Sequence, residues 1–131
     1  DYLQKAVEDA IEKDKEVIKN IIKNMKEKNS VVDLSGKTSL RELAFFINKC
    51  GLFITNDSGP MHIASGVGAS VVALFGPTDP KLTGPRGMGE STVLQYIPPG
   101  YSVPFMGKDL PEEGWLSHIG PEQVLEAVEK I

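Results

Sequence analysis

The chain has 131 residues, of which 40% are hydrophobic and 24% are charged, and its net charge is −4 at pH 7. This length suits one compact domain and is too short for two of ordinary size. With an acidic balance and no basic block we expect no nucleic-acid partner, and no apolar run approaches the roughly 20 residues that cross a bilayer.

The single cysteine, Cys50, excludes an internal disulfide and a cysteine zinc cluster. We expect it to be a small buried residue at a helix end. The N-terminus shows no basic start followed by an apolar run and a cleavage site, so the expected location is the cytoplasm.

Residues 1–29 have the pattern of a long amphipathic helix. Apolar side chains such as Val7, Ile11, Ile18 and Ile22 recur at three- and four-residue steps. The pattern predicts one helix from residue 2 to about residue 28, or two helices in line with a break near Asp14. Charges of alternating sign fill the other face, which is typical of a solvated surface.

Residues 30–80 predict a βαβαβ core. Short apolar runs at residues 31–34, 52–55 and 70–75 are candidate strands, and helical segments separate them. Thr38 or Ser39 is the expected N-cap of the first of these helices. Strands that are apolar throughout and alternate with helices indicate parallel strands covered on both faces. The predicted fold class is therefore α/β, with a Rossmann-like parallel sheet and flanking helices.

Residues 81–120 are rich in loops, and residues 121–131 predict a closing helix with Pro121 in its first turn. An edge strand is expected at residues 92–97. The segment that begins with Lys81 and Arg86 could close over an anionic ligand, or it could be only a connector. Together these segments predict a single domain over residues 1–131.

Three turns are expected along one edge of the sheet, because parallel strands all point the same way. They are residues 35–39, 56–60 and 76–80, and each holds a glycine and at least one hydroxyl. Ligands bind at the carboxyl ends of the strands in open α/β sheets. Gly36, Gly59 and Gly76 let backbone N–H groups approach such a ligand closely.

The middle turn predicts an anion site at the start of a helix. Asp57 or Ser58 can cap that helix, Pro60 suits its first turn, and Gly59 leaves the N–H groups unshielded. Phosphate is the usual anion at such a terminus. The alternative is a helix start that only caps well. A carboxylate repels phosphate, so Asp57 is expected to cap the helix or to accept a hydrogen bond from a ligand hydroxyl.

The other candidate side chains are open to two interpretations each. His62 could donate to a phosphate or to a neighbouring carbonyl, and Lys37 could face the ligand or only solvent. Thr78 offers a hydroxyl on the third turn. Position 31 is Val31 where a P-loop needs glycine, and no G-x-G-x-x-G follows a strand, which argues against NAD or FAD. The two histidines make a histidine metal site improbable.

The stretch "DLSGKTSLRELAFFINKCGLFITNDSGPMHIASGVGASVVALFGPTDP" resembles the C-terminal domain of glycosyltransferase family 9, the ADP-heptose:lipopolysaccharide heptosyltransferases. The resemblance runs from about Val31 to Pro80, and "NDSGPMH" and "ALFGPTDP" stand at the family's separation. It implies the incomplete C-terminal half of a GT-B enzyme, which binds a nucleotide-sugar donor such as ADP-heptose.

The resemblance also implies roles for the candidate residues. The loop matching Lys37 and Thr38 lies beside the adenine, and the segment matching Asp57, Ser58 and Gly59 meets the diphosphate and the sugar. No metal or other cofactor is expected, because transfer in the family is metal-independent. The predicted substrate-binding residues are Gly36, Lys37, Thr38, Asp57, Ser58, Gly59, Pro60, Met61, His62, Gly76 and Thr78.

By the same resemblance, the acceptor-binding N-terminal domain and its general base are missing from this sequence. We therefore predict no catalytic residue here, an inactive isolated chain, and a lipid acceptor bound elsewhere in a parent enzyme that is peripheral at the inner membrane. One alternative is a non-catalytic domain that self-associates through an exposed sheet edge or the N-terminal helix. Another is half of a different nucleotide-sugar enzyme, such as an epimerase.

Overall fold

The computed structural model describes residues 2–107 and 114–131. The chain divides into two compact units, Asp1–Leu43 and Ala44–Ile131. The boundary falls inside helix α2, which spans Leu40–Lys49. The single domain that the sequence predicts over residues 1–131 stays a prediction.

The first unit begins with one unbroken helix, α1, which spans Tyr2–Asn24. The expected amphipathic helix is present, without a break near Asp14, and it ends about a turn earlier than predicted. At its end the N–H of Met25 is shared between the carbonyls of Ile21 and Ile22, at 3.2 Å from each. Such shared bonds are common where a helix terminates.

Residues 31–34 do not form the strand that their apolar run predicted. Their hydrogen bonds are local: Val31 N–H donates to the Lys28 carbonyl (3.2 Å), and Ser35 N–H donates to the Asp33 carboxylate (2.9 Å). The bonds from the Ser35 hydroxyl and N–H lower the pKa of Asp33. Three apolar residues out of four favour burial, but a strand also needs a neighbouring strand to pair with. Here the segment instead lies along an apolar pocket beside α1.

A capping box begins α2. Ser39 N–H and Oγ both lie 2.7 Å from Glu42 Oε2, and Glu42 N–H donates back to Ser39 Oγ at 3.3 Å. The two bonds that the Glu42 carboxylate accepts, first from the Ser39 N–H and second from the Ser39 hydroxyl, lower the pKa of Glu42. Of the two N-caps considered from the sequence, Ser39 is the correct one.

Cys50 follows the last turn of α2 and is exposed, so the prediction that it is a core residue is wrong. Its Sγ turns back to within 3.3 Å of the Phe46 carbonyl. The helix ends before this residue, so Cys50 lies outside the apolar stripe that Ile47, with 2% exposure, occupies. Cysteine is usually buried, but this one is exposed because it follows the end of the helix.

The second unit is built on a parallel sheet in the order β1-β2-β3, which confirms the α/β class. The strands are β1 (Phe53–Asn56), β2 (Val71–Phe75) and β3 (Ser91–Gln95). Asn56 pairs with Leu74, and Phe75 pairs with Gln95. The expected edge strand is β3, and the three carboxyl ends lie at one edge of the sheet.

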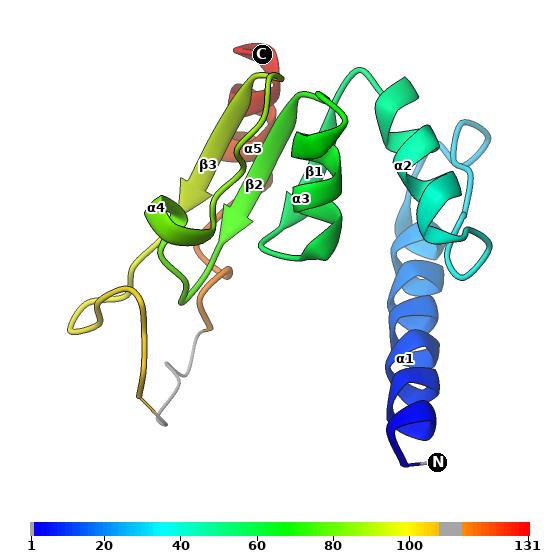
Figure 1. Cartoon of the computed structure of the whole chain (residues 1–131), viewed down its shortest axis with the longest axis horizontal. Helices are drawn as coiled ribbons and strands as arrows, with labels where there is room; N and C mark the ends of the chain where they lie inside the picture. The colour runs from blue at the N-terminus through cyan, green and yellow to red at the C-terminus, as the bar shows by residue number, and fades with distance from the viewer. Residues whose placement is uncertain (1, 108–113) are drawn as a thin grey trace. The chain divides into compact units, whose positions relative to one another are not determined.

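Central strand β2 forms the core of this unit. Val72, Ala73 and Phe75 have 0% exposure, because helices cover both faces. Helix α3 (Gly59–Gly66) contacts β1 and β2, and helix α5 (Pro121–Glu129) contacts β2 and β3 from the opposite face (Figure 1). Pro121 takes the first helical position, as the sequence predicted.

The connection from β2 to β3 contains one short helix, α4 (Pro80–Thr83), and then returns along α3. A Cβ on Gly87 would lie 2.0 Å from the Ser65 carbonyl oxygen, so the backbones are in close contact there. Arg86 donates to the Lys81 carbonyl at 2.7 Å. These contacts favour the connector interpretation of this segment.

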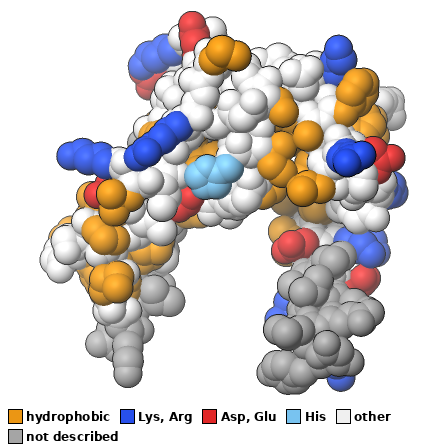
Figure 2. Space-filling model, in the orientation of Figure 1, with side chains coloured by type: hydrophobic (Ala, Val, Ile, Leu, Met, Phe, Trp, Pro, Cys, Tyr) orange, Lys and Arg blue, Asp and Glu red, His pale blue; other side chains and the backbone are white. Residues whose placement is uncertain are grey.

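Basic and acidic side chains are interspersed on the face of the molecule that Figure 2 shows. Their mixture agrees with the modest net charge of −4. Within the described residues, none of the helices combines the length and the apolar character that a membrane span requires.

We expect Gly87→Ala to lower the free energy of unfolding by about 2 kcal/mol or more, because the added methyl has no room beside the Ser65 carbonyl. Gly66→Ala is the matched control, since a Cβ there meets nothing within 4 Å. It should be neutral or stabilising by up to about 1 kcal/mol. Urea unfolding of both variants tests this, and equal stabilities would show that the loop does not pack closely on α3.

Candidate functional site

The turns that leave β1 and β2 lie at the same edge of the sheet (Figure 1). The first leads through Asp57 and Ser58 into α3, and the second runs from Gly76 to Asp79, the N-cap of α4. The ladder continues into the first turn, where Asp57 N–H donates to the Leu74 carbonyl at 3.2 Å. Strand pairing therefore places the two turns side by side.

Asp57 joins the two turns through its carboxylate. Thr78 Oγ1 donates to Asp57 Oδ2 at 2.5 Å. Thr83 Oγ1 lies 3.3 Å from the same oxygen and 3.3 Å from the Asp79 carbonyl, and its single hydrogen is shared between these two acceptors. The residues are 21 and 26 positions apart in the sequence. The sequence analysis expects Asp57 and Thr78 to offer hydrogen-bonding groups to a ligand. In the structure these two side chains are hydrogen-bonded to each other.

The N-terminus of α3 has no side-chain cap. Ser58 holds the N-cap position, but its hydroxyl donates to the Asn56 carbonyl (3.2 Å) and accepts no N–H of the helix. Asp57 does not cap the helix either, because it faces Thr78. Gly59 is exposed, and a Cβ there would meet nothing within 4 Å. The amide of Gly59 is thus unshielded at the positive end of the helix dipole, whereas Pro60 has no N–H and the Met61 N–H donates to the Ser58 carbonyl at 3.1 Å.

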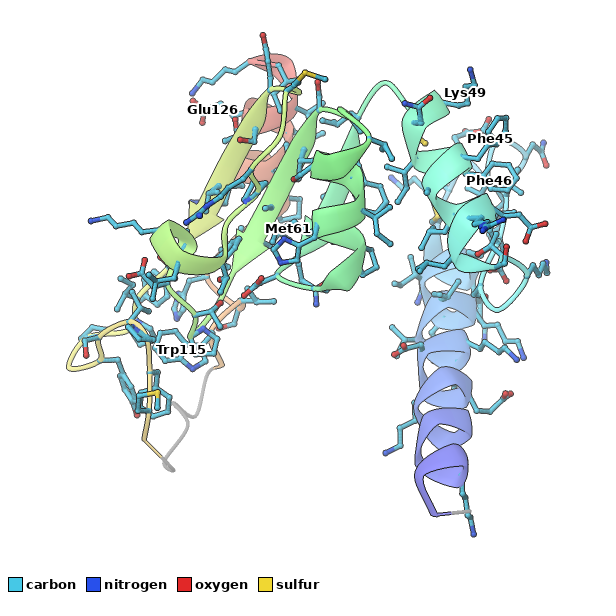
Figure 3. The ribbon with its side chains drawn as sticks, viewed as in Figure 1. Phe45, Phe46, Lys49, Met61, Trp115 and Glu126 are labelled. Carbon is cyan, nitrogen blue, oxygen red and sulfur yellow. The ribbon has the colours of Figure 1, made fainter. Side chains whose placement is uncertain are left out.

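Pro60, Met61 and His62 differ in how far they are buried. Pro60 is half-buried in the first turn, and Met61 has 0% exposure and packs α3 onto the sheet (Figure 3). His62 is exposed at the start of the helix. The structure therefore gives the Met61 side chain a packing role. In the part of the chain that is described, no three His, Cys, Asp or Glu side chains gather as a metal site would require.

A pocket of about 340 Å³ opens between the two turns. Trp115 closes one side of it, with 7% exposure, and a Cβ on Gly76 would lie only 3.1 Å from Trp115 Cβ. Figure 3 shows Trp115 near the loops that follow the strand ends. Sequence reasoning missed this residue, because a tryptophan in a loop gives no local signal of what it packs against. The lining residues are Asn56, Asp57, Leu74, Gly76, Pro77, Thr78, Trp115 and Leu116.

Gln95 at the end of β3 is a second residue that the sequence did not reveal. Its Nε2 donates to the Gly76 carbonyl (2.8 Å) and to the Thr78 carbonyl (2.9 Å). Phe105 N–H donates to the carbonyl between them, that of Pro77, at 2.8 Å. The carbonyls of Gly76, Pro77 and Thr78 are therefore all satisfied within the protein.

Gly36, Lys37 and Thr38 belong to the first compact unit. Gly36 has a φ of +68°, a left-handed conformation that favours glycine. Lys37 Nζ donates to the Asp33 carbonyl at 2.8 Å, and Thr38 lines the apolar pocket beside α1. These three residues follow a segment that is not a strand, so the expected third strand end is absent, and their place in the site stays a prediction.

Sequence comparison identifies the family. The profile of glycosyltransferase family 9 (heptosyltransferase) matches residues 6–99, which is most of the chain. The chain belongs to glycosyltransferase family 9. The matched range includes both turns of the site and residues of both compact units.

Known relatives of this family 9 chain agree. It is 35% identical over 121 residues to lipooligosaccharide heptosyltransferase 2 of Campylobacter jejuni, covering 90% of the chain and 38% of the relative. It is 35% identical over 97 residues to lipopolysaccharide heptosyltransferase 2 of Escherichia coli K12, covering 72% and 27%. A crystal structure of a family 9 glycosyl transferase from Veillonella parvula superimposes with a TM-score of 0.70 at 33% identity, covering 88% of this chain and 32% of that one. The chain thus spans 38% or less of these relatives.

We expect Thr78→Val to lower the free energy of unfolding by about 1.5 kcal/mol, because it removes the shorter of the two hydrogen bonds to the Asp57 carboxylate. Thr78→Ser keeps the hydroxyl and should lose no more than about 0.5 kcal/mol. Urea unfolding at pH 7 measures both. Valine and serine variants of equal stability would contradict a stabilising link between the two turns.

Proposed function

We propose that this chain is the donor-binding half of a heptosyltransferase in lipopolysaccharide core synthesis, and that it binds ADP-heptose or a closely similar nucleotide sugar. The observation that carries the proposal is the uncapped N-terminus of α3 beside the pocket that holds Asp57 and Thr78. Family membership directs this chemistry toward a heptosyl donor. The expected location in the cytoplasm is part of the proposal.

The diphosphate is proposed to bind at the start of α3. The amide of Gly59 is unshielded, and the helix dipole favours negative charge there. An exposed His62 on the first turn offers a further donor. As the sugar is transferred, negative charge develops on the departing diphosphate, and these fixed donors would stabilise it without a metal ion.

The sugar is proposed to lie toward Asp57. Among the described residues, both hydroxyls that reach this carboxylate bond to Oδ2, so Oδ1 can accept from a sugar hydroxyl. The hydrogen bonds from the threonine hydroxyls also partly neutralise the charge of Asp57, which reduces its repulsion of a nearby diphosphate. The adenine end is proposed, from the family resemblance alone, to meet Lys37 and Thr38.

No catalytic residue is proposed within the chain. In the transfer, an acceptor hydroxyl attacks the anomeric carbon, the bond from that carbon to the diphosphate oxygen breaks, and a general base takes the hydroxyl proton. The resemblance assigns that base, and the lipid acceptor, to an acceptor-binding domain. We therefore propose that this chain alone binds donor and does not transfer sugar.

Titration of the ¹⁵N-labelled chain with ADP tests the proposal. We expect amide shifts at Ser58, Gly59 and Thr78, smaller shifts with UDP and GDP, and a shift at Thr38 if the first unit meets the adenine. No shift at any of these amides with any nucleotide would contradict the proposal.

Gly59→Asp separates charge from folding. The site has room for the side chain, and an acidic residue suits the first turn of a helix, so the fold should be kept. The added charge should weaken ADP binding about tenfold or more, which is about 1.4 kcal/mol. Gly51→Asp is the control: it adds the same charge outside the site, at a position where a Cβ also meets nothing within 4 Å. This variant should bind ADP as the wild type does. Equal weakening of both variants would argue against an anion site at α3.

Self-association is a second candidate function, and an exposed apolar row on α1 favours it. Val17 and Ile21 are 57% and 56% exposed and lie one turn apart. We expect sedimentation velocity to detect a dimer at high concentration, and expect Val17→Glu with Ile21→Lys to abolish it. A chain that stays monomeric at every concentration would exclude this function.

A further inference from the structure

We infer that Gln95 is a positioning residue for the donor site: its side-chain amide fixes the turn at Gly76–Thr78 and, through Thr78, the carboxylate of Asp57. The inference rests on the proposed function and deepens it. Gln95 is not among the residues that line the pocket, so it acts through others.

Strand register brings Gln95 to the turn. It pairs with Phe75, the last residue of β2, so its side chain lies beside the first residue of the turn. From there Nε2 donates one hydrogen to the Gly76 carbonyl at 2.8 Å and the other to the Thr78 carbonyl at 2.9 Å. Both N–H hydrogens of one amide are used, and they hold the two ends of the turn at a fixed separation.

The direction of the remaining backbone groups follows from these bonds. In a trans peptide the C=O and the next N–H point in opposite directions. Phe105 holds the Pro77 carbonyl and Gln95 holds the Thr78 carbonyl, so the N–H groups of Thr78 and Asp79 point away from those two partners. The carbonyls, which would repel a diphosphate, are directed into the protein.

Thr78 passes the position of the turn to Asp57. Its carbonyl is held by Gln95 and its hydroxyl donates to Asp57 Oδ2 at 2.5 Å. A turn that moved would shorten, bend or break that bond, and the carboxylate would lose its fixed orientation. A side chain with two N–H donors suits this place, because a carboxylate would face two carbonyl oxygens and an apolar side chain would leave both unpaired.

Gln95→Glu tests the inference with a readout that depends on protonation. At pH 8 the new carboxylate faces two carbonyls, and we expect ADP-heptose to bind the 131-residue chain about tenfold more weakly than wild type by isothermal titration. At pH 5 a protonated Glu donates one hydrogen bond, so the affinity ratio of variant to wild type should recover in part. Asp57, Asp79, His62 and the ligand phosphate are present in both proteins, so the ratio reports the change made at position 95.

Two further variants serve as controls. Gln95→Met keeps the length of the side chain and cannot titrate, so we expect an affinity loss of about fivefold that is the same at both pH values. Gln123→Glu adds the same charge on α5, where the side-chain Oε1 only accepts from Gly120 N–H at 2.8 Å, and it should bind as wild type does. Urea unfolding at each pH confirms that every variant is folded, and Gln95→Met decides the question if Gln95→Glu is unfolded.

The outcomes are separable. Wild-type chain that binds neither ADP nor ADP-heptose overturns the proposed function and this inference with it. Wild-type chain that binds, together with a Gln95→Glu variant that binds equally well at pH 8 or a Gln95→Met variant equal to wild type, overturns the inference alone. A loss for Gln95→Glu at pH 8 that shrinks at pH 5, with no such recovery for Gln95→Met, supports it.

Discussion

Parallel pairing of β2 with a strand on each side is the constraint on which the site depends. Because β1, β2 and β3 run in one direction, the residues that follow them meet at one edge, and Asp57, Gly76 and Gln95 become neighbours. Burial of β2 on both faces holds this arrangement, since each large side chain that it buries contributes about 1.5–3 kcal/mol. The geometry of the edge therefore depends on buried apolar residues of β2, such as Val72 and Phe75, that do not line the pocket.

The edge combines two features that would conflict if they were not separated in space. The unshielded Gly59 amide and the helix dipole at the start of α3 favour an anion, and the neighbouring Asp57 would repel one. The conflict is reduced because Thr78 and Thr83 donate to one oxygen of the carboxylate and turn it toward the second turn. The start of α3 is thus the part of the proposed site that suits a diphosphate, and the pocket around Asp57 and Thr78 suits hydroxyl groups. We propose that a nucleotide sugar uses both.

Membership of glycosyltransferase family 9 gives this geometry its chemical context. The matching residues, 6–99, extend across both compact units, so the family pattern includes the turn at Gly36–Thr38 as well as the two turns of the sheet. The relatives are heptosyltransferases much longer than this chain, which spans 38% of one of them at 35% identity. We propose donor binding as the part of their activity that this chain carries.

The sequence by itself determined the elements whose signals are local: the amphipathic α1, a helix start at Thr38 or Ser39, the apolar strands of the sheet and the glycine-containing turns. Tertiary structure decided the rest, because an apolar run encodes burial but not a partner for pairing. Residues 31–34 therefore read as a strand and are not one, and Cys50 reads as buried and is exposed. The link from Asp57 to Thr78 spans 21 positions and that from Gln95 to Gly76 spans 19. Contacts at such separations depend on strand register and crossover path, which no local pattern records.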